Sequence, residues 1–465
     1  MTGEYDLIIV GGGAGAFAAA IKANELGAKT LIINKGLPLG GTCVNVGCVP
    51  SKTLLWAAEV KHLAQNHHIP GLDIEVKEFD FQKVIADELA LVDKLREEKY
   101  KKVLDRLEHV AFKEGWAKFS GEAKVEVDGK RFSGRKFIIA TGSKAAVPNV
   151  PGLQEAGYLT HIEALKLQGL PKRLAVLGGG AVALEFAQMF SRFGSEVTLI
   201  HRSDRFLRMA DENHVAKLID IFKSEGIDVR PDTRITGVRT ADGAKIIELE
   251  GTDALEVDEI LVATGKSPNT KGLGLENVNV EVNENGAVRV DKHYKTDNEA
   301  IFAVGDVADL PLRLETTAGR EGTLASENAL SSTKYTVDYG SVPFTIFTDP
   351  QIAGVGLDEE RQLAKMKVCA CRTVNLADVP KAKIMRRTVG LVSMSVHPET
   401  GVVLGVQLLA PHAGELVAEA MMLVKNKNTV GDLINSLPMF PTLSEGIKLA
   451  ALSFKKDISS ISCCI

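Results

Sequence analysis

The chain has 465 residues, which at roughly 100–200 residues per domain predicts about two to four domains. A formal net charge of −5, with 25% charged and 45% hydrophobic residues, excludes the broad basic surface that nucleic acid or an anionic membrane would require. No apolar run approaches the roughly 18 residues that span a bilayer, and the start lacks the basic region of a signal peptide. We therefore expect a cytoplasmic protein.

Residues 5–33 predict a strand, a glycine-rich turn, a helix and a second strand. In this turn, Gly11 allows a tight bend, Gly13 lets the backbone approach a pyrophosphate, and Ala16 permits close helix–strand packing. The free N–H groups at the helix start would face the phosphates. The second strand ends at Asn34, where an acid usually binds the ribose hydroxyls, and an asparagine can still accept one hydrogen bond. The segment predicts a dinucleotide site.

The same plan recurs later in the chain, where Gly178 and Gly180 occupy the corresponding positions of a second Gly-x-Gly-x-x-Ala turn. Its second strand ends at His201, again without an acid, and Arg202 and Arg208 lie just beyond it. Cationic groups at this place can pair with a 2′-phosphate, whereas an acid would select the plain ribose. The sequence therefore favours NADPH over NADH, the alternative being that both arginines are solvated surface residues.

An apolar strand that ends in Ala-Thr-Gly also occurs twice, which indicates an internal duplication of a nucleotide-binding plan. From about residue 340 the pattern changes to alternating strands and amphipathic helices. The predicted fold class is α/β, with two Rossmann-like dinucleotide-binding domains and a C-terminal α+β domain. Beyond the two turns, short antiparallel strands are expected over 122–139, and helices over 52–66, 80–108, 413–426, 429–436 and 444–454.

The motif GTCVNVGCVPSK contains Cys43 and Cys48, five residues apart. Pro50 suits the first turn of the helix that follows, which would put Cys48 at a helix N-terminus. The helix dipole and free N–H groups there stabilise a thiolate. A disulfide across so short a loop adds little stability, so a reversible redox role explains the pair better than two buried structural thiols.

The whole chain resembles the pyridine nucleotide-disulfide oxidoreductases of the glutathione reductase and lipoamide dehydrogenase type. The resemblance rests on GTCVNVGCVPSK, the two glycine turns, ATGKSPNT and FAVGDVAD, in that order and spacing. It implies FAD at the first site, NADPH at the second, and a homodimer held by the C-terminal domain. The implied domains are 1–147 for FAD, 148–268 for NADPH, 269–338 for the second part of the FAD and central region, and 339–465 for dimerisation.

The resemblance also assigns roles to individual residues. Lys52 would lie near the flavin N5 and face Glu185, Cys48 would be the thiolate that touches the flavin, and Cys43 would meet the substrate. The residues implied to bind FAD are Gly11, Gly13, Ala14, Gly15, Asn34, Gly41, Thr42, Lys52, Thr141, Gly142 and Asp306. Those implied to bind the nicotinamide nucleotide are Gly178, Gly180, Glu185, Arg202, Arg208 and Gly265.

Members of this family that reduce disulfides carry a His-Pro-x-x-x-Glu motif near the C-terminus, and its histidine protonates the leaving thiolate. In this chain Pro441 and Glu445 match, but the histidine position is Phe440. A phenyl ring transfers no proton, so disulfide chemistry loses its acid. A soft metal ion, which thiolates bind well, needs electrons but no protonated leaving group.

The C-terminal region, ending in Cys463-Cys464, resembles the mercuric reductase branch of the family. The resemblance implies that this tail passes Hg(II), delivered as thiol complexes, to Cys43 and Cys48 of the partner subunit. It also implies that Tyr100 is an active-site tyrosine. A second tyrosine, usual in that branch, is replaced by Phe440, so the part its hydroxyl plays is in doubt.

Three other interpretations remain open. A thioredoxin-reductase-like enzyme would also end in a cysteine pair, but it would keep the histidine. Lipoamide dehydrogenase would require both the histidine and an acid near Arg202. The chain could also be a metal-sequestering flavoprotein without turnover. Cys369 and Cys371 are expected either to point together into the core from one strand or to form another metal pair.

Overall fold

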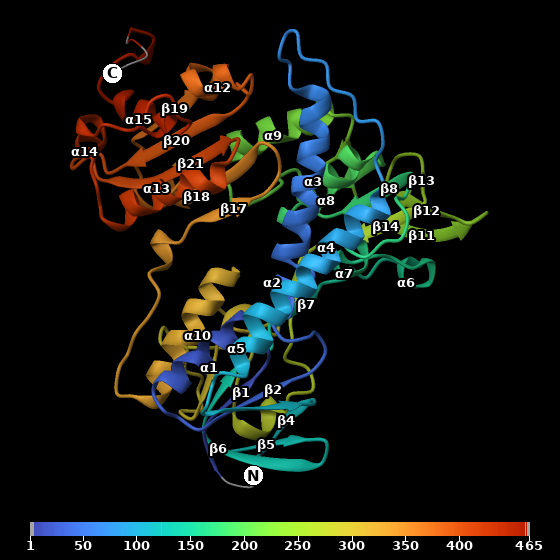
Figure 1. Ribbon diagram of the computed structural model, residues 1–465, viewed down its shortest axis with the longest axis vertical. Helices are drawn as coiled ribbons and strands as arrows, with labels where there is room; N and C mark the ends of the chain where they lie inside the picture. The colour runs from blue at the N-terminus through green and yellow to red at the C-terminus, as the bar shows by residue number, and fades with distance from the viewer. Residues whose placement is uncertain (1–3, 122, 461, 463–465) are drawn as a thin grey trace.

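A computed structural model describes residues 4–121, 123–460 and 462. The chain forms three sheet-based parts, the first of which is completed by residues that follow the second part, and Figure 1 shows them around two long helices that cross the middle of the molecule. The part nearest the N-terminus lies at one end, and the C-terminal part lies at the other beside the second dinucleotide fold. Among the described residues, no helix is long and apolar enough to cross a membrane.

The first part contains a seven-stranded sheet in the order β3-β2-β1-β6-β5-β4, with β16 also paired to β6. Its central strands are apolar and almost fully buried because helices cover one face, while side chains of β4, of β5 and of the segment 273–288 cover the other. Helices α1 (Ala14–Glu25) and α10 (Glu315–Leu330) lie side by side on it (Figure 1). The strands are β1 (Tyr5–Val10), β2 (Thr30–Asn34), β3 (Val110–Glu114), β4 (Ala117–Gly121), β5 (Lys124–Val127), β6 (Lys130–Ile139) and β16 (Ile301–Ala303).

The second part repeats the first in a smaller parallel sheet, in the order β10-β9-β8-β14. Helix α8 (Ala181–Phe193) follows β8 and is buried over most of its length, while α9 (Glu212–Ser224) precedes β10. The parallel strands are β8 (Arg173–Leu177), β9 (Glu196–Ile200), β10 (Asp228–Arg230) and β14 (Glu259–Val262), and an antiparallel sheet adds β11 (Ile235–Ala241), β12 (Ala244–Leu249) and β13 (Leu255–Val257).

The C-terminal part is an antiparallel sheet in the order β17-β18-β21-β20-β19, packed against helices. Its strands are β17 (Phe344–Ile346), β18 (Gln351–Gly356), β19 (Cys371–Asn375), β20 (Leu391–Val396) and β21 (Val403–Ala410). Its helices are α11 (Glu359–Met366), α12 (Pro380–Ile384), α13 (Ala413–Lys425), α14 (Val430–Asn435) and α15 (Glu445–Leu452). The expected fold class is confirmed, and the expected helices at 413–426, 429–436 and 444–454 each have a counterpart.

Two helical segments connect these parts. Helix α2 (Gly41–Val46) leads through Gly47 into α3 (Cys48–Asn66), which packs against α8 of the second part. The expected helix over 80–108 is interrupted: α4 (Phe81–Arg96) runs into a π-helical turn, η1 (Glu97–Lys101), and the short α5 (Lys102–Leu104). A two-stranded ribbon, β7 (Ser143–Ala145) with β15 (Lys266–Pro268), joins the two dinucleotide folds. The short helices α6 (Leu153–Ala156) and α7 (His161–Ala164) follow β7.

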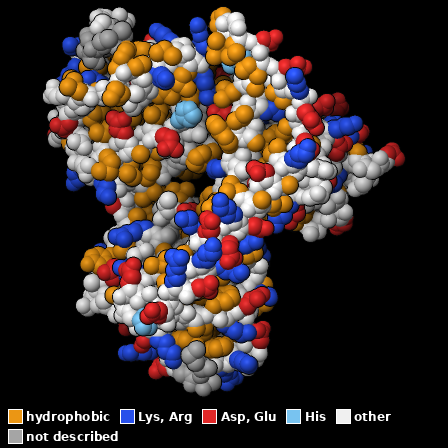
Figure 2. Space-filling view, in the orientation of Figure 1, with side chains coloured by type: hydrophobic (Ala, Val, Ile, Leu, Met, Phe, Trp, Pro, Cys, Tyr) orange, Lys and Arg blue, Asp and Glu red, His pale blue; other side chains and the backbone are white. Residues whose placement is uncertain are grey.

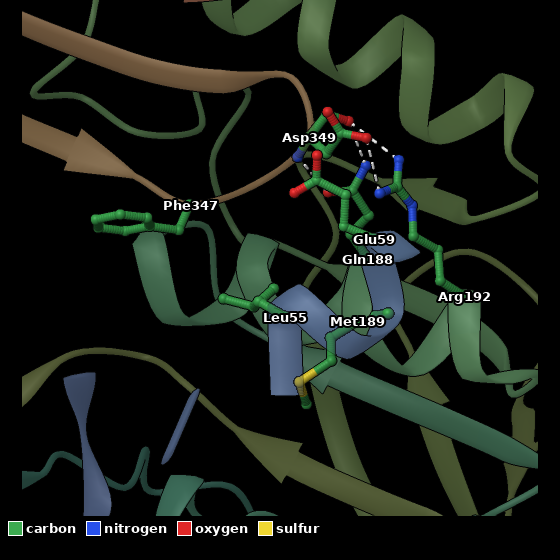
Figure 3. Close-up of a pocket in the computed structure, with 8 residues that line it drawn as sticks. Leu55, Glu59, Gln188, Met189, Arg192, Phe347 and Asp349 are labelled. Carbon is green, nitrogen blue, oxygen red and sulfur yellow. Dashed lines mark hydrogen bonds and ion pairs between the residues drawn. The ribbon is translucent and has the colours of Figure 1, made fainter. Parts of the chain in front are cut away.

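A buried ion cluster lies where the three parts meet (Figure 3). The Arg192 side chain, only 5% exposed, pairs with Asp349 at 3.0 Å and with Glu225 at 2.7 Å. Gln188 Nε2 donates to the Asp349 carbonyl at 2.7 Å, and the Asp349 N–H donates back to Gln188 Oε1 at 2.7 Å. Arg387 pairs with both Glu59 and Asp349. The charges are compensated and hydrogen-bonded, as buried ions must be.

Candidate active site

The two cysteines of the GTCVNVGCVPSK motif lie on consecutive helices, Cys43 within α2 and Cys48 as the first residue of α3. The structure contains both as free thiols, with Cys48 more exposed than Cys43. Buried Asn45 fixes α2, because its Nδ2 donates to the Gly41 carbonyl at 2.8 Å and its Oδ1 accepts from Arg96 at 3.1 Å. The two thiols are thereby positioned at one rigid turn.

The two thiols have opposite acidities. The hydrogen bond from the Cys43 thiol, followed by the charge of Lys52, lowers the pKa of Cys48 to about 7, against an opposing effect of burial. The same hydrogen bond to Cys48, burial and the neighbouring Glu315 carboxylate raise the pKa of Cys43. Around pH 7 the first of the two thiol protons is therefore lost, and the thiolate that forms is Cys48 at the helix N-terminus.

Lys52 lies one helical turn beyond Cys48. Its Nζ is 2.7 Å from Glu185 Oε2 and 4.7 Å from the centre of the Phe347 ring. Glu185, 4% exposed on α8, also accepts the Phe347 N–H through Oε1 at 2.8 Å. This pair fixes α3 of the first part against α8 of the second, and it faces Phe347 of the C-terminal part.

Replacing Lys52 by methionine is expected to raise the pKa of Cys48, because the variant loses a positive charge that favours the thiolate. Alkylation of Cys48 in the flavin-free protein should slow by about two- to fivefold at pH 7, with the rate–pH curve displaced to higher pH. Peptide mass spectrometry after timed iodoacetamide treatment measures this rate. Lys61→Met, on the same helix but bonded to the Arg192 carbonyl, is the matched control. An equal effect of both variants would contradict the assignment.

The first glycine turn is shaped by contacts that exclude a side chain. Gly11 has φ +131°, and a Cβ there would lie 2.1 Å from the carbonyl oxygen of Ala140. Gly13 precedes α1 without any side-chain cap, so the helix N–H groups stay free for an anion. A Cβ on Gly41, at the start of α2, would lie 2.6 Å from Gly13 Cα. The cysteine-bearing helix therefore packs directly on this turn.

The second glycine turn repeats this geometry. Gly178 has φ +141°, and a Cβ there would lie 2.2 Å from the carbonyl oxygen of Ala263, which stands where Ala140 stands in the first fold. Gly180 precedes α8, again with no side-chain cap. In both folds the Ala-Thr-Gly segment thus ends a strand directly above the turn. The sequence duplication is a structural duplication.

The residues after the second strand differ between the two folds. The Asn34 side chain stands over the first turn, where its Nδ2 donates to the Leu37 carbonyl at 2.9 Å, and within the described residues its Oδ1 accepts no hydrogen bond. In the second fold Arg202 and Arg208 are exposed. Burial lowers the pKa of His201, and the positive charges of the two arginines lower it further. Arg208 Nη2 donates to Ser203 Oγ at 3.1 Å, and neither arginine pairs with a carboxylate of a described residue, so both charges are available to an anion.

The linker segments between the folds gather several more candidate residues. Thr141 Oγ1 donates to the Asn269 carbonyl at 2.8 Å, while Gly142 and Gly265 both have positive φ at the ends of the β7–β15 ribbon. Asp306 follows β16, and its Oδ2 accepts from Ser143 at 2.6 Å and from Lys266 at 3.2 Å. The first fold can use this carboxylate to bind ligand hydroxyls.

Tyr100 lies within the π-helical turn η1, a feature that often marks functional sites. Its ring meets Phe17 edge-on at 4.9 Å, and a Cβ on Gly40 would lie 3.0 Å from it. Burial, and then the charges of Cys43 and Glu315, raise the pKa of Tyr100 to about 12. The phenol therefore stays protonated beside the thiols, as a hydrogen-bond donor.

Comparison with known proteins agrees with this architecture. Residues 5–322 match the family model described as pyridine nucleotide-disulphide oxidoreductase, and residues 342–451 match the dimerisation domain of the same family. The chain belongs to the pyridine nucleotide-disulphide oxidoreductase family. It is therefore an oxidoreductase that depends on FAD and NAD(P)H, and the dimerisation domain supports a homodimer.

Curated relatives within this family are similar over almost the whole chain. The mercuric reductase of Streptomyces lividans is 39% identical over 475 residues, covering 99% of this chain and 98% of the relative. That of Staphylococcus aureus is 38% identical over 469 residues, covering 99% and 84%. Among solved structures, the HOCl-induced flavoprotein disulfide reductase RclA of Escherichia coli, as a Cu(II) complex, superposes with a TM-score of 0.88 at 27% identity, covering 98% and 100%.

Both cofactors of the family fit the residues present. Two helices of 12 and 13 residues begin uncapped behind glycine turns in which a Cβ would clash with backbone. Such an N-terminus receives a pyrophosphate. Asn34 Oδ1 and the Asp306 carboxylate could accept from the hydroxyls of the first dinucleotide. The individual cofactor contacts remain predictions.

The dimerisation domain exposes an apolar segment between α14 and α15. Leu437 is 95% exposed, Met439 76% and Phe440 44%, and Met422 on α13 is also exposed. Hydrophobic side chains gather over this domain in Figure 2. Exposed apolar surface of this kind marks a protein interface, which agrees with a homodimer.

Two outcomes differ from what the sequence suggested, and one prediction falls outside the described residues. Cys369 and Cys371 form a disulfide with each other and are partly buried, so the expectation that both point into the core is wrong, while the alternative of a metal pair stays a prediction. Glu315, the first residue of α10, contacts Cys43 and was not expected, because no motif marks it. The tail residues Cys463 and Cys464 lie outside the described part of the chain.

Proposed function

We propose that this chain reduces Hg(II) to Hg(0) at Cys43 and Cys48 of a homodimer, with NADPH as the electron source. One observation carries the proposal: seven curated relatives, 36–39% identical over at least 98% of this chain, are named mercuric reductase. The overall reaction converts NADPH and Hg(II) into NADP⁺, H⁺ and Hg(0). The cytosol supplies NADPH and keeps thiols reduced, and is the compartment we propose.

The chemistry of the thiol pair supports this reaction. A thiolate is the preferred ligand of a soft ion, and about half of the Cys48 side chains are thiolates at pH 7 because the pKa is lowered to about 7. The Cys43 thiol, whose pKa is raised, gives up its proton when it also binds the ion. FAD, when bound, supplies the two electrons taken from the nicotinamide.

The sequence and the titration of Tyr100 favour metal reduction over disulfide reduction, the competing use of the pair. Expelling a thiolate from a disulfide requires an acid with a pKa near neutrality. Phe440 occupies the position of the family's histidine, and Tyr100, with its pKa raised to about 12, is a poor proton donor at pH 7. Metal reduction needs neither group as an acid.

We further propose that Cys463 and Cys464 of one subunit pass Hg(II) to Cys43 and Cys48 of the other. Two neighbouring thiols near a chain end can exchange a soft ion with small thiols in solution. The dimerisation domain brings two copies of the chain together, which the transfer requires.

The test is an assay with one enzyme and three electron acceptors. Purified protein with FAD, NADPH and excess small thiol is given Hg(II), Cu(II) or an oxidised small disulfide, and NADPH oxidation and volatile mercury are measured. Hg(II) is expected to drive turnover with release of Hg(0). Turnover with the disulfide alone would establish a disulfide reductase instead. Cu(II) is included because RclA was solved with it.

The tail is tested separately with the variant Cys463→Ala/Cys464→Ala. We expect slower turnover when Hg(II) is delivered by bulky thiols, because these complexes reach the active site poorly without a carrier. Smaller complexes should show a weaker effect. Equal rates for the variant and the unmodified chain with every complex would remove the relay role and leave the reductase activity standing.

Nucleotide preference depends on the two exposed arginines. Arg202→Ala/Arg208→Ala is expected to raise the KM for NADPH by about 10- to 100-fold, because the 2′-phosphate loses its charge-assisted partners, and to leave the KM for NADH within about twofold. Steady-state kinetics measure the KM for NADPH and the KM for NADH in the variant and in the unmodified chain. Arg230→Ala, near the end of β10 and paired with Asp228, is the control. Parallel losses for NADPH and NADH would contradict a 2′-phosphate site.

A further inference from the structure

A second group of metal-binding side chains lies on the C-terminal sheet, away from the α2–α3 turn. Glu359 begins α11, Cys371 begins β19, and Cys369 precedes that strand by two residues. The carboxylate oxygen and the two sulfurs all lie within 4.8 Å of one another. No role in the proposed reaction uses these three residues.

The surroundings of Cys371 suit a reduced sulfur. Gln362 is fully buried on α11, its Nε2 donates to the Val396 carbonyl at 2.7 Å, and its Oε1 lies 3.1 Å from Cys371 Sγ. In the disulfide this sulfur has no proton, so it cannot donate to Oε1. In the dithiol it can, and a bound cation could take the same oxygen as a ligand. Burial of Gln362 therefore favours the reduced or metal-bound pair.

A small recess with mixed polar and apolar walls adjoins these residues and opens to solvent. Cys371, Glu359 and Gln407 contribute to its lining, together with serine and threonine side chains of β19 and β20. Gln407 is only 3% exposed, and neither its Oε1 nor its Nε2 has a hydrogen-bond partner in the described part of the chain. An unpaired amide at such depth is costly unless something polar enters the recess.

We propose that Cys369, Cys371 and Glu359 form a second metal site, which takes a d¹⁰ divalent cation of the zinc group once the disulfide is reduced. Two small thiol molecules reduce the disulfide and leave as one oxidised disulfide. The cation then replaces the two thiol protons, which pass to solvent. Two thiolates and a carboxylate carry three negative charges and suit soft to borderline ions. The site stands independently of the reaction at Cys43 and Cys48.

The experiment examines Cys369 and Cys371 in a variant that has no other cysteine. Of the six cysteines, Cys43, Cys48, Cys463 and Cys464 are replaced by serine, which leaves Cys369 and Cys371. The full-length variant is reduced with a monothiol, desalted anaerobically and titrated with Cd(II). Ultraviolet thiolate-to-metal absorption and equilibrium dialysis report binding. We expect one Cd(II) per chain after reduction and none before it.

Two further variants on the same background test the ligands. Cys369→Ser/Cys371→Ser should abolish the absorption band, and Glu359→Gln should weaken binding by about tenfold or more. Glu399→Gln, an exposed residue of the same domain, is the matched control and should bind like its parent. Circular dichroism establishes that each variant is folded.

Several results would overturn the proposal. The first is that the monothiol does not reduce the disulfide, as measured by counting alkylated cysteines. The second is that the reduced pair binds no Cd(II), and the third is that Cd(II) still binds to the Cys369→Ser/Cys371→Ser variant. Equal weakening by Glu359→Gln and Glu399→Gln would remove the carboxylate from the site. None of these results bears on Hg(II) turnover, which the cysteines of the first site govern.

Discussion

Replacing Cys48 by serine is expected to lower the rate of metal-dependent NADPH oxidation by more than about 100-fold. Loss of a residue that only supports a metal ligand can already lower activity by up to about 100-fold, and Cys48 would bind the metal itself. Serine has an ordinary alcohol pKa and does not ionise near pH 7, whereas the pKa of Cys48 is lowered to about 7 by Cys43 and Lys52. Cys43→Ser should have a similar effect, because one thiolate does not retain Hg(II) against excess small thiol. Stopped-flow absorbance and volatile mercury measure both losses.

The control for these variants must separate chemistry from folding. Each cysteine variant should keep its bound FAD, because the flavin turn around Gly11 and Gly13 depends on backbone contacts and not on the thiols. Thr53→Ala removes a hydroxyl on α3 that donates to the Val49 carbonyl, and should leave turnover within about twofold. A flavin-loaded Cys48→Ser enzyme with more than half of its activity would refute the assignment.

Replacing Gly178 by alanine is expected to weaken NADPH binding by about 10- to 100-fold, the equivalent of roughly 1.4–2.8 kcal/mol. The new Cβ would lie 2.2 Å from the Ala263 carbonyl oxygen, and φ +141° is unfavourable for alanine. The turn must therefore open, which moves the N–H groups of α8 that face the pyrophosphate. Isothermal titration of the FAD-loaded protein measures the dissociation constant.

Gly194 offers the matched control for this substitution. It ends the same helix with φ +123°, but a Cβ there would meet only Leu170 Cδ2 at 3.9 Å. Gly194→Ala thus carries the backbone strain without the clash and should bind NADPH nearly as the unmodified chain does. FAD content should be the same in both variants. Equal weakening by both would mean that backbone strain, and not the Ala263 contact, controls the turn.

Features set by short sequence segments were predictable. The turns at Gly11 and Gly178 need glycine because a Cβ there would clash with the backbone of the neighbouring strand. The spacing of the glycines in the sequence is enough to indicate both turns. Cys48 begins α3 as expected, because Pro50 suits a first helical turn and Gly47 precedes it. The repeated Ala-Thr-Gly segments likewise indicated two similar folds.

Features that depend on distant segments were not predictable. Glu315 reaches Cys43 only because α10 packs on α1, a contact between the two ends of the first part. The Cys369–Cys371 bond is possible because Cys369 precedes β19 and is not part of that strand, which alternation along a strand does not reveal. Nothing in the pattern over 80–108 marks the π-helical turn that contains Tyr100.

The buried ion cluster has a consequence for chimaeras. Arg192 belongs to the second fold, Glu59 to a helix of the first, and Asp349 and Arg387 to the C-terminal part, while Glu225 follows α9. Exchanging any one part for that of a relative with a different residue would leave an uncompensated buried charge, which costs about 3–5 kcal/mol. A functional chimaera must therefore exchange these charged residues together with the parts that carry them.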